Sequence, residues 1–310
     1  MTPCATTEFI DVGRGRRVRV LRCGPKQGNE RTPTYIIDAA CGWHAAMYAW
    51  LIRGLSSHGT TIAYDRAGLG RSSPNIVPPD GEGRAAELHE LILALKLEDP
   101  LILIGHSIAG LYLRVFAHHY RDYTRALVFL DATHTLVHKL FEHRQPFQDR
   151  TRMVLAHCGH WLGVTRLPFP LERASQMPWA TLPEEARCEV EYLSGQPRAA
   201  VTACAERALL PAASQQAKAC GTLNNLPILV ISAGIRTPRE LRYEADAEGF
   251  MEKWLLLQKD LTTLSSHSVF LAIEGAGHCD LVTDHRFATQ GVKAILQFTE
   301  SHLIEAAPHV

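Results

Sequence analysis

The sequence predicts an α/β fold in which a mostly parallel central sheet is flanked by helices and interrupted by one helical insertion. Short apolar runs alternate along the chain with longer amphipathic segments, which is the pattern of repeated βα units. The runs are continuously apolar, as expected for strands that helices cover on both faces. A length of 310 residues is sufficient for one large domain with an insertion.

The amino-terminal segment predicts a β-hairpin ahead of this alternation. Residues 8–12 and 16–23 are two strand candidates, and Gly13, Arg14 and Gly15 form the turn between them. Apolar and charged residues roughly alternate in the second candidate, which is typical of a strand.

Six further strands and several helices are predicted from the apolar residues. The strands are residues 34–38, 60–65, 101–104, 126–130, 228–232 and 269–273. The helices lie between them, where apolar residues recur at helical spacing. The clearest helical patterns are Leu88, Leu91, Ile92 and Leu95; Trp254, Leu257, Leu261 and Leu264; and Val292, Ile295 and Leu296. Packing of helices on a sheet is enough to explain these patterns.

The stretch 134–226 breaks the alternation and contains no convincing strand. Prolines divide it into short helices and turns, among them Pro168, Pro170, Pro178, Pro183, Pro197 and Pro211. We predict that residues 1–133 and 227–310 form the core domain and that residues 134–226 form an inserted helical lid. Four large apolar side chains of the lid either form a wall for a hydrophobic substrate or pack within the lid itself: Trp161, Phe169, Met177 and Trp179.

Composition narrows the class of partner. The chain carries 32 basic and 32 acidic residues, and this balance disfavours nucleic acids and anionic membranes as partners. The amino terminus lacks the pattern of a secretory signal, and no run of 18 apolar residues occurs. We therefore expect a cytoplasmic protein with a small-molecule substrate, while the oligomeric state stays open. The eight cysteines form no Cys-x-x-Cys pair, which favours buried free thiols.

A serine at the junction of a strand and a helix is the strongest chemical signal. Residues 101–110 read LILIGHSIAG, which places Ser107 directly after a buried strand and at the start of a helix. Gly105 and Ala109 are small enough for the sharp turn that projects a nucleophilic hydroxyl out of a sheet. The helix amino terminus supplies positive potential for a developing oxyanion.

This segment resembles the nucleophile elbow of the α/β-hydrolase family, and other segments match that family in order. Residues 64–72 read YDRAGLGRS and are similar to its Y-D-x-x-G-x-G-x-S turn, while residues 98–100 lead into the elbow strand as the family's segments do. The resemblance covers nearly all of the chain apart from the lid. It implies the α/β-hydrolase fold with Ser107 as nucleophile, and it disfavours epoxide hydrolases and dehalogenases, which use Asp at that position.

His278 is expected to be the general base. Residues 274–278 read EGAGH and follow the last predicted strand, where they resemble the loop that carries the family's catalytic histidine. A serine hydroxyl is a poor nucleophile at neutral pH, and imidazole provides a base with a pKa near that pH. Chain order and the glycine-rich loop single out His278 among sixteen histidines.

The acid of the triad has several candidates. Most members of the family place it after the seventh strand in a loop that reads roughly G-x-x-D, whereas residues 233–240 read AGIRTPRE. Asp131 ends the sixth strand, a position that resembles the alternative used by pancreatic-type lipases and some haloalkane dehalogenases. We expect Asp131 to be the acid, although it could instead only brace its loop. Glu240, Glu244 and Asp246 are the other candidates.

An oxyanion hole needs two backbone N–H groups. The resemblance assigns one to Ile108, which follows the nucleophile, and the other to the loop at residues 38–43, which read DAACGW. Aligning Ala39 and Ala40 with the family's His-Gly or Ala-Gly dipeptide makes Cys41 the second donor. A nucleophilic role for Cys41 is a weaker alternative, because no strand-elbow context surrounds it.

These residues predict a serine hydrolase that cleaves a carboxylic ester, lactone or thioester of a small hydrophobic molecule through an acyl-enzyme. The chemistry needs no cofactor and no metal, and we expect none. The same triad also serves carbon-carbon bond hydrolases, hydroxynitrile lyases and prolyl aminopeptidases, and a non-catalytic ligand-binding module of this fold can retain it. Metal binding by His134, His138 and His143 is disfavoured, because the segment lacks the glutamate of H-E-x-x-H.

Overall fold

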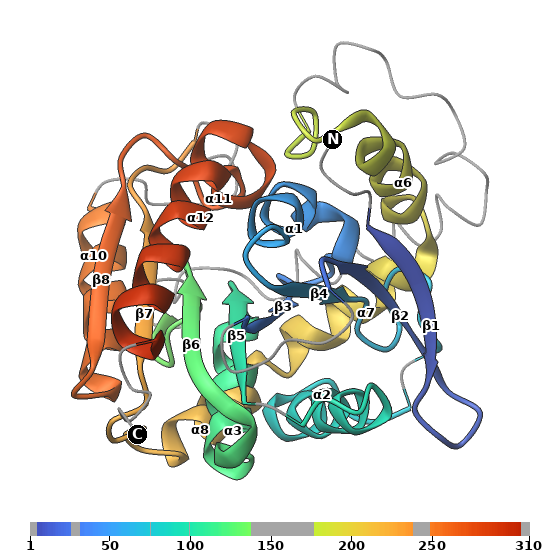
Figure 1. The fold of residues 1–310 in the computed structure, drawn as a ribbon, viewed down its shortest axis with the longest axis horizontal. Helices are drawn as coiled ribbons and strands as arrows, with labels where there is room; N and C mark the ends of the chain where they lie inside the picture. The colour runs from blue at the N-terminus through green and yellow to red at the C-terminus, as the bar shows by residue number, and fades with distance from the viewer. Residues whose placement is uncertain are drawn as a thin grey trace.

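The central feature of the computed structural model is one mixed sheet. The structure describes residues 5–25, 32–74, 76–98, 100–137, 177–237 and 249–304. Within these ranges eight strands pair in the order β1-β2-β4-β3-β5-β6-β7-β8 (Figure 1). Their bounds are β1 Thr6–Asp11, β2 Arg17–Cys23, β3 Thr34–Asp38, β4 Thr60–Tyr64, β5 Leu101–His106, β6 Thr124–Leu130, β7 Ile228–Ala233 and β8 Ser268–Ile273. The β1/β2 and β2/β4 pairs are antiparallel and all the others are parallel, so the predicted fold class is confirmed.

All eight predicted strands are present, each within two residues of its expected bounds. One expectation about them is wrong. The apolar run in β8 suggested a strand covered on both faces, yet Val269 and Leu271 are each 37% exposed. β8 is the last strand of the sheet, and helices cover an edge strand less completely than the central strands.

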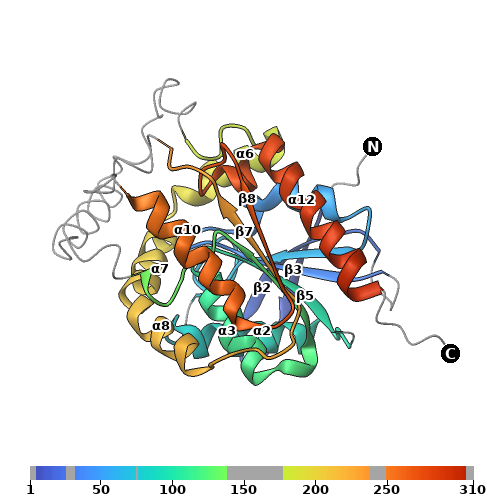
Figure 2. The same ribbon diagram turned by 90° about the vertical axis from the view of Figure 1, so that its left-hand side faces the viewer.

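Helices cover both faces of the sheet, as Figures 1 and 2 show. The main helices of the two layers are α1 Ala49–Leu55 and α12 His285–Thr299 on one face, and α2 Gly81–Ala94, α3 Ala109–His119 and α8 Leu210–Ala219 on the other. Successive side chains of a strand point to opposite faces. In β3, Tyr35 and Ile37 therefore join the hydrophobic cluster under α1 and α12, and Ile36 joins the one under α2 and α3.

The three helical patterns read from the sequence fall on α2, α12 and α10 (Phe250–Asp260), which continues into a short 3-10 helix. Side-chain caps mark two of the starts. The Asp80 carboxylate accepts the Gly83 N–H ahead of α2, and the Asp284 carboxylate accepts the Arg286 N–H ahead of α12. None of the helices in the described ranges is long and apolar enough to cross a membrane.

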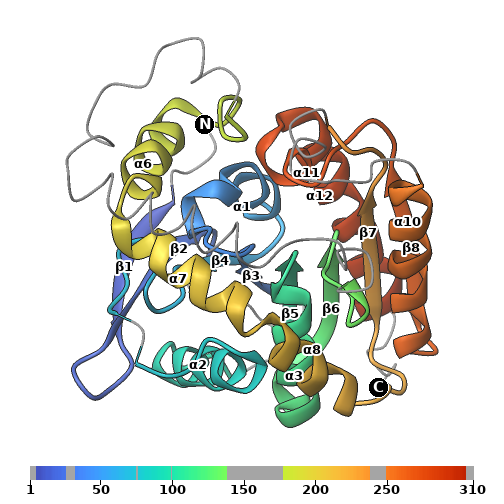
Figure 3. The same cartoon turned by 180° about the vertical axis from the view of Figure 1, so that it is seen from behind.

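Much of the predicted lid, including Trp161 and Phe169, lies outside the described residues. Its described part forms α6 (Glu184–Ser194), α7 (Pro197–Ala208) and α8, which follow one another across the view in Figure 3. α8 packs on α2 and α3 and buries Ala213 and Ala217 in their hydrophobic cluster. The division of the chain into a core and a lid stays a prediction.

Candidate active site

Ser107 lies in a sharp turn between β5 and α3. Its φ of +58° places a residue other than glycine in the left-handed region. A Cβ added to Gly105 would lie 2.8 Å from the Leu113 Cδ1 and 3.1 Å from the backbone carbon of Ala109, so a side chain there would crowd the turn and glycine is favoured. The half-buried Ser107 is thereby presented at the carboxyl end of a central strand.

Asp131 and His278 are joined by a short hydrogen bond. The Asp131 Oδ2 lies 2.6 Å from the His278 Nδ1. Asp131 is fully buried directly after β6, and its Oδ1 accepts the Ala233 N–H at 2.9 Å and the Trp254 Nε1–H at 2.7 Å. Both carboxylate oxygens thus accept hydrogen bonds, which fixes the orientation of the carboxylate toward His278.

The surroundings of Asp131 keep it ionised. Burial by itself raises the pKa of this carboxyl. The hydrogen bond and the charge of His278, together with the Arg236 guanidinium 3.8 Å away, outweigh burial and hold the Asp131 pKa well below its usual range. An ionised carboxylate at Nδ1 favours the tautomer with its proton on that nitrogen, which leaves Nε2 available as a base. The His278 side chain is 20% exposed, so its ring is accessible.

Backbone hydrogen bonds join the turn at Ser107 to the loop of Asp131. The Ser107 N–H donates to the Leu130 carbonyl at 3.1 Å, and the Ser107 carbonyl accepts the Thr133 N–H at 2.8 Å. These partners flank Asp131 on both sides. The structure therefore brings Ser107, Asp131 and His278, three of the predicted site residues, to one region at the carboxyl edge of the sheet.

A chain of hydrogen bonds that the sequence did not indicate crosses the same region. The Ala40 N–H donates to the Tyr48 hydroxyl at 2.7 Å, and this hydroxyl donates to the His106 Nδ1 at 3.0 Å. The His106 Nε2 then donates to the His278 carbonyl at 3.1 Å. Burial, reinforced by the nearby His278, lowers the pKa of His106 to about 3, so this ring is neutral near pH 7. In the sequence, only the position of His106 next to Ser107 could have indicated that it lies in this region.

The two residues predicted as oxyanion donors lie at different loops of the same edge. Ile108 is buried at the start of α3, and Cys41 lies in the turn after β3. The Cys41 thiol donates to the Ala203 carbonyl at 3.4 Å, and burial raises its pKa to about 12. A thiol with this pKa stays protonated at neutral pH, which argues against a nucleophilic Cys41.

A buried cluster of charges lies beside the Cys41 turn. Arg66 pairs with Asp38 at 2.6 Å and with Glu206 at 2.9 Å, and Glu206 also pairs with Arg84 at 2.9 Å. Burial raises the pKa of the Glu206 carboxyl, but the two arginines outweigh burial and lower it overall. Arg66 belongs to the Y-D-x-x-G-x-G-x-S segment, whereas nothing in the local sequence marked Glu206.

The structure gives little support to the alternative candidates for the acid and for a metal site. Glu240, Glu244 and Asp246 lie outside the described residues, as do His138 and His143 of the metal alternative. The His134 Nε2 lies 2.9 Å from the Asp260 carboxylate. No group of three or more His, Cys, Asp or Glu side chains is placed to hold a metal in the part of the chain that the structure describes.

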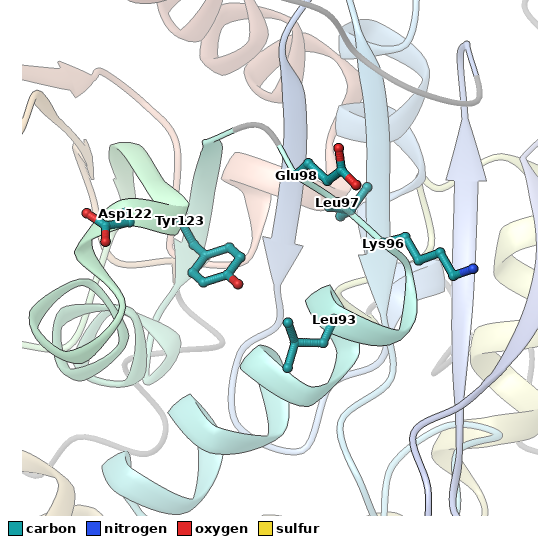
Figure 4. Close-up of a pocket in the computed structure, with 6 residues that line it drawn as sticks. All are labelled: Leu93, Lys96, Leu97, Glu98, Asp122 and Tyr123. Carbon is teal, nitrogen blue, oxygen red and sulfur yellow. The ribbon is translucent and has the colours of Figure 1, made fainter.

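A surface hollow lies on the opposite edge of the sheet (Figure 4). It is lined by Leu93, Lys96, Leu97, Glu98, Asp122 and Tyr123. These residues precede β5 and β6 in the chain, whereas Ser107 and Asp131 follow those strands. Because the two strands are parallel, the hollow lies at their amino ends and does not belong to the candidate active site.

Solved structures with the same fold include several hydrolases. An esterase from Thermogutta terrifontis superposes with a TM-score of 0.63 at 18% identity, covering 96% of this chain and all of the other. An enol-lactonase from Burkholderia xenovorans superposes with a TM-score of 0.62 at 18% identity, covering 94% of this chain and all of the other. The epoxide hydrolase CorEH gives 0.66 at 19%, covering 96% and 99%. These likenesses establish the fold.

Sequence comparisons give the family. A protein of the AB hydrolase superfamily from Gibberella zeae is 33% identical over 110 residues, which is 34% of each chain. The human (lyso)-N-acylphosphatidylethanolamine lipase is 26% identical over 128 residues, which is 40% of this chain and 36% of the lipase. The matches thus span about a third of these relatives. Residues 39–290 match the profile of the Alpha/beta hydrolase family, and the chain therefore belongs to that family.

Proposed function

We propose that the protein is a serine hydrolase that cleaves a carboxylic ester, lactone or thioester of a small hydrophobic molecule through an acyl-enzyme. The observation that carries this proposal is the 2.6 Å hydrogen bond between the buried Asp131 carboxylate and the His278 Nδ1. It lies beside Ser107, which occupies a strained turn at the carboxyl end of a central strand. A nucleophile, a base and an acid are thus available in one place.

The reaction follows from the roles these groups can take. The Ser107 hydroxyl attacks the carbonyl carbon while the His278 Nε2 accepts its proton, and the ionised Asp131 stabilises the imidazolium that forms. The N–H groups of Ile108 and Cys41 bind the tetrahedral oxyanion. Collapse of the intermediate expels the alcohol or thiol, which takes the proton from His278. Water then repeats the sequence on the acyl-enzyme and releases the acid.

Apolar groups near the turn favour a hydrophobic substrate. The half-buried Trp43 ring lies 5.5 Å from the His106 ring, centroid to centroid, and so stands next to the nucleophile's neighbour. Family membership supports a hydrolase, and the identity of the side chain at position 107 favours ester cleavage over epoxide opening. A serine forms an acyl-enzyme with a carbonyl substrate, and this intermediate can be captured.

Active-site labelling tests the proposal. We expect a fluorophosphonate probe to label the protein at Ser107, as located by mass mapping, and p-nitrophenyl esters of graded chain length to be hydrolysed. Ser107→Ala should abolish both, whereas Ser57→Ala, a change at an exposed serine, should abolish neither. A folded protein that is neither labelled nor active on these esters would point instead to a lyase or a ligand-binding module.

A further inference from the structure

One buried ion pair holds the turn on both sides of Cys41. The Arg66 guanidinium donates to the Ala40 carbonyl at 2.9 Å, ahead of Cys41. The Glu206 carboxylate accepts the Gly42 N–H at 3.0 Å, after it. Arg66 and Glu206 are bound to each other through two hydrogen bonds, of 2.9 Å and 3.1 Å. The three residues of the turn are therefore fixed to a single charged unit.

These contacts set the direction of the Cys41 N–H. In a trans peptide the carbonyl and the N–H point to opposite sides, and the described chain has no cis peptide. The Ala40 carbonyl points to Arg66, so the Cys41 N–H points away from Arg66. The Gly42 N–H points to Glu206, so the Cys41 carbonyl points away from Glu206. The Ala40 carbonyl also accepts the Trp43 N–H at 3.0 Å, so the Ala40–Cys41 peptide is held from two sides. Loss of the Glu206 contact would therefore act first on the Cys41–Gly42 peptide, whose N–H bonds to Glu206.

Glu206 belongs to α7, which packs directly against this turn. The Cys41 thiol bonds to the Ala203 carbonyl, one helical turn before Glu206. A Cβ added to Gly42, whose φ is +71°, would lie 2.6 Å from the Ala203 Cβ. The Thr202 hydroxyl donates to the Gly68 carbonyl at 3.0 Å, which ties α7 to the loop after β4 as well. Helix and turn therefore leave no room for a side chain at position 42.

We propose that Glu206 is a positioning residue, which acts through Arg66 and Gly42 to aim the Cys41 N–H at the oxyanion. The inference rests on the proposed function. Glu206 itself is fully buried, and its carboxylate accepts hydrogen bonds from two arginines and a backbone N–H. Burying such charges costs several kcal/mol per ion before pairing, which makes the cluster an inefficient way to stabilise a fold. A helix of the segment 134–226 thus completes the catalytic site of the core.

The test compares two buried glutamates of the same cluster. Glu206→Gln keeps the size of the side chain but removes its charge. Glu87→Gln is the matched control, because Glu87 is equally buried and pairs with Arg84 at 2.6 Å but does not touch the Cys41 turn. We expect Glu206→Gln to lower kcat on a p-nitrophenyl ester about 10- to 100-fold, somewhat less than loss of a whole oxyanion donor. KM should change less than threefold, and Glu87→Gln should leave kcat within threefold of wild type.

The affinity for a transition-state analogue distinguishes a positioning role of Glu206 from a purely structural one, because a structural role would leave this affinity unchanged. A trifluoromethyl ketone forms a tetrahedral adduct with the nucleophile, and its affinity should fall in Glu206→Gln by the same factor as kcat/KM. Both variants are compared for thermal unfolding. Equal losses of kcat in the two variants, or a change confined to KM, would overturn the proposal.

A second pair of variants applies if Glu206→Gln does not fold. Gly42→Ala should lower kcat, because it places a Cβ against Ala203 and also strains a backbone with a φ of +71°. Ala203→Gly should restore in part the kcat of Gly42→Ala, because it removes the opposing Cβ but leaves the backbone strain. The reference for the double variant is Ala203→Gly alone, and no restoration would overturn the proposal. A wild-type protein without labelling or turnover would overturn the proposed function as well, whereas an active wild type with indistinguishable variants overturns this inference alone.

Discussion

Two constellations of buried charged residues lie at the carboxyl ends of the parallel strands, and they differ in whether their groups can exchange a proton. In the first, Asp131 is paired with His278, whose ring remains 20% exposed. In the second, Arg66 and Glu206 are both fully buried, and the guanidinium keeps its charge at any physiological pH. The first can pass a proton to a bound molecule, whereas the second can only hold what it touches. Burial of charge alone therefore does not locate the chemistry.

The largest effect is expected at Ser107, the proposed nucleophile. Ser107→Ala removes one oxygen atom from a half-buried turn and leaves the Asp131–His278 pair intact, so the fold should survive and ester turnover should drop by about 10⁶-fold, to the level of the remaining groups. Stopped assays with a p-nitrophenyl ester, together with a thermal unfolding curve, measure both. Turnover near that of wild type would show that the first constellation serves some other purpose.

The second-largest effect is expected at Asp131, the proposed acid. Asp131→Asn keeps the shape of the side chain but no longer selects the histidine tautomer that leaves Nε2 free, so kcat should fall by about 10⁴-fold. Steady-state kinetics across the pH range give this number. A loss below tenfold would assign Asp131 to bracing its loop and would move the search for the acid to the carboxylates at 240, 244 and 246.

Tyr48 connects the two constellations, because its hydroxyl bonds to the Ala40 N–H and to His106. The Ala40 carbonyl in turn bonds to Arg66, and His106 bonds to the His278 carbonyl. Tyr48→Phe leaves the buried Ala40 N–H and the His106 ring without the hydroxyl as a partner, which should lower the free energy of unfolding by about 1–3 kcal/mol. Urea titration followed by circular dichroism measures the loss. Unchanged stability would mean that the hydroxyl contributes nothing net to holding the two loops together.

The smallest effect concerns acid sensitivity and His106. Its folded pKa of about 3 lies below the unfolded value. At a pH between these two values the unfolded chain binds a proton at this histidine that the folded protein does not bind. The free energy of unfolding is therefore highest above the unfolded pKa and declines as the pH falls toward the folded pKa. The unfolded pKa of a histidine is about 6.5. Between pH 6.5 and pH 5 the free energy of unfolding should therefore decline by roughly 1.5 kcal/mol less in His106→Gln than in the wild type. Parallel declines in the variant and wild type would refute a buried, neutral His106.

The sequence was sufficient for features that depend on neighbours in the chain. The turn at Ser107 depends on Gly105 and on a strand followed by a helix, and the loop of His278 follows a recognisable last strand. The position of Asp131 at the end of β6 also follows from the strand pattern. In parallel strands these ends share one edge, so their meeting could be anticipated.

Other contacts depend on packing and left no local signal. Glu206 reaches Arg66 across 140 positions of the chain, and α7 meets the Cys41 turn through Ala203 and Gly42. Periodicity cannot indicate which buried glutamate a distant arginine will choose. The exposure of β8 likewise depends on its place at the end of the sheet rather than on its composition.

The left-handed backbone at Ser107 has a consequence for anyone who selects heat-resistant variants. An L-residue in this region costs roughly 1–2 kcal/mol relative to a relaxed conformation, and glycine avoids that cost. A screen that rewards survival at high temperature alone would thus enrich glycine at position 107 and collect well-folded proteins without the proposed nucleophile. Thermal stability and the proposed catalysis place opposite demands on this residue. Only a screen that also selects for turnover would retain the serine.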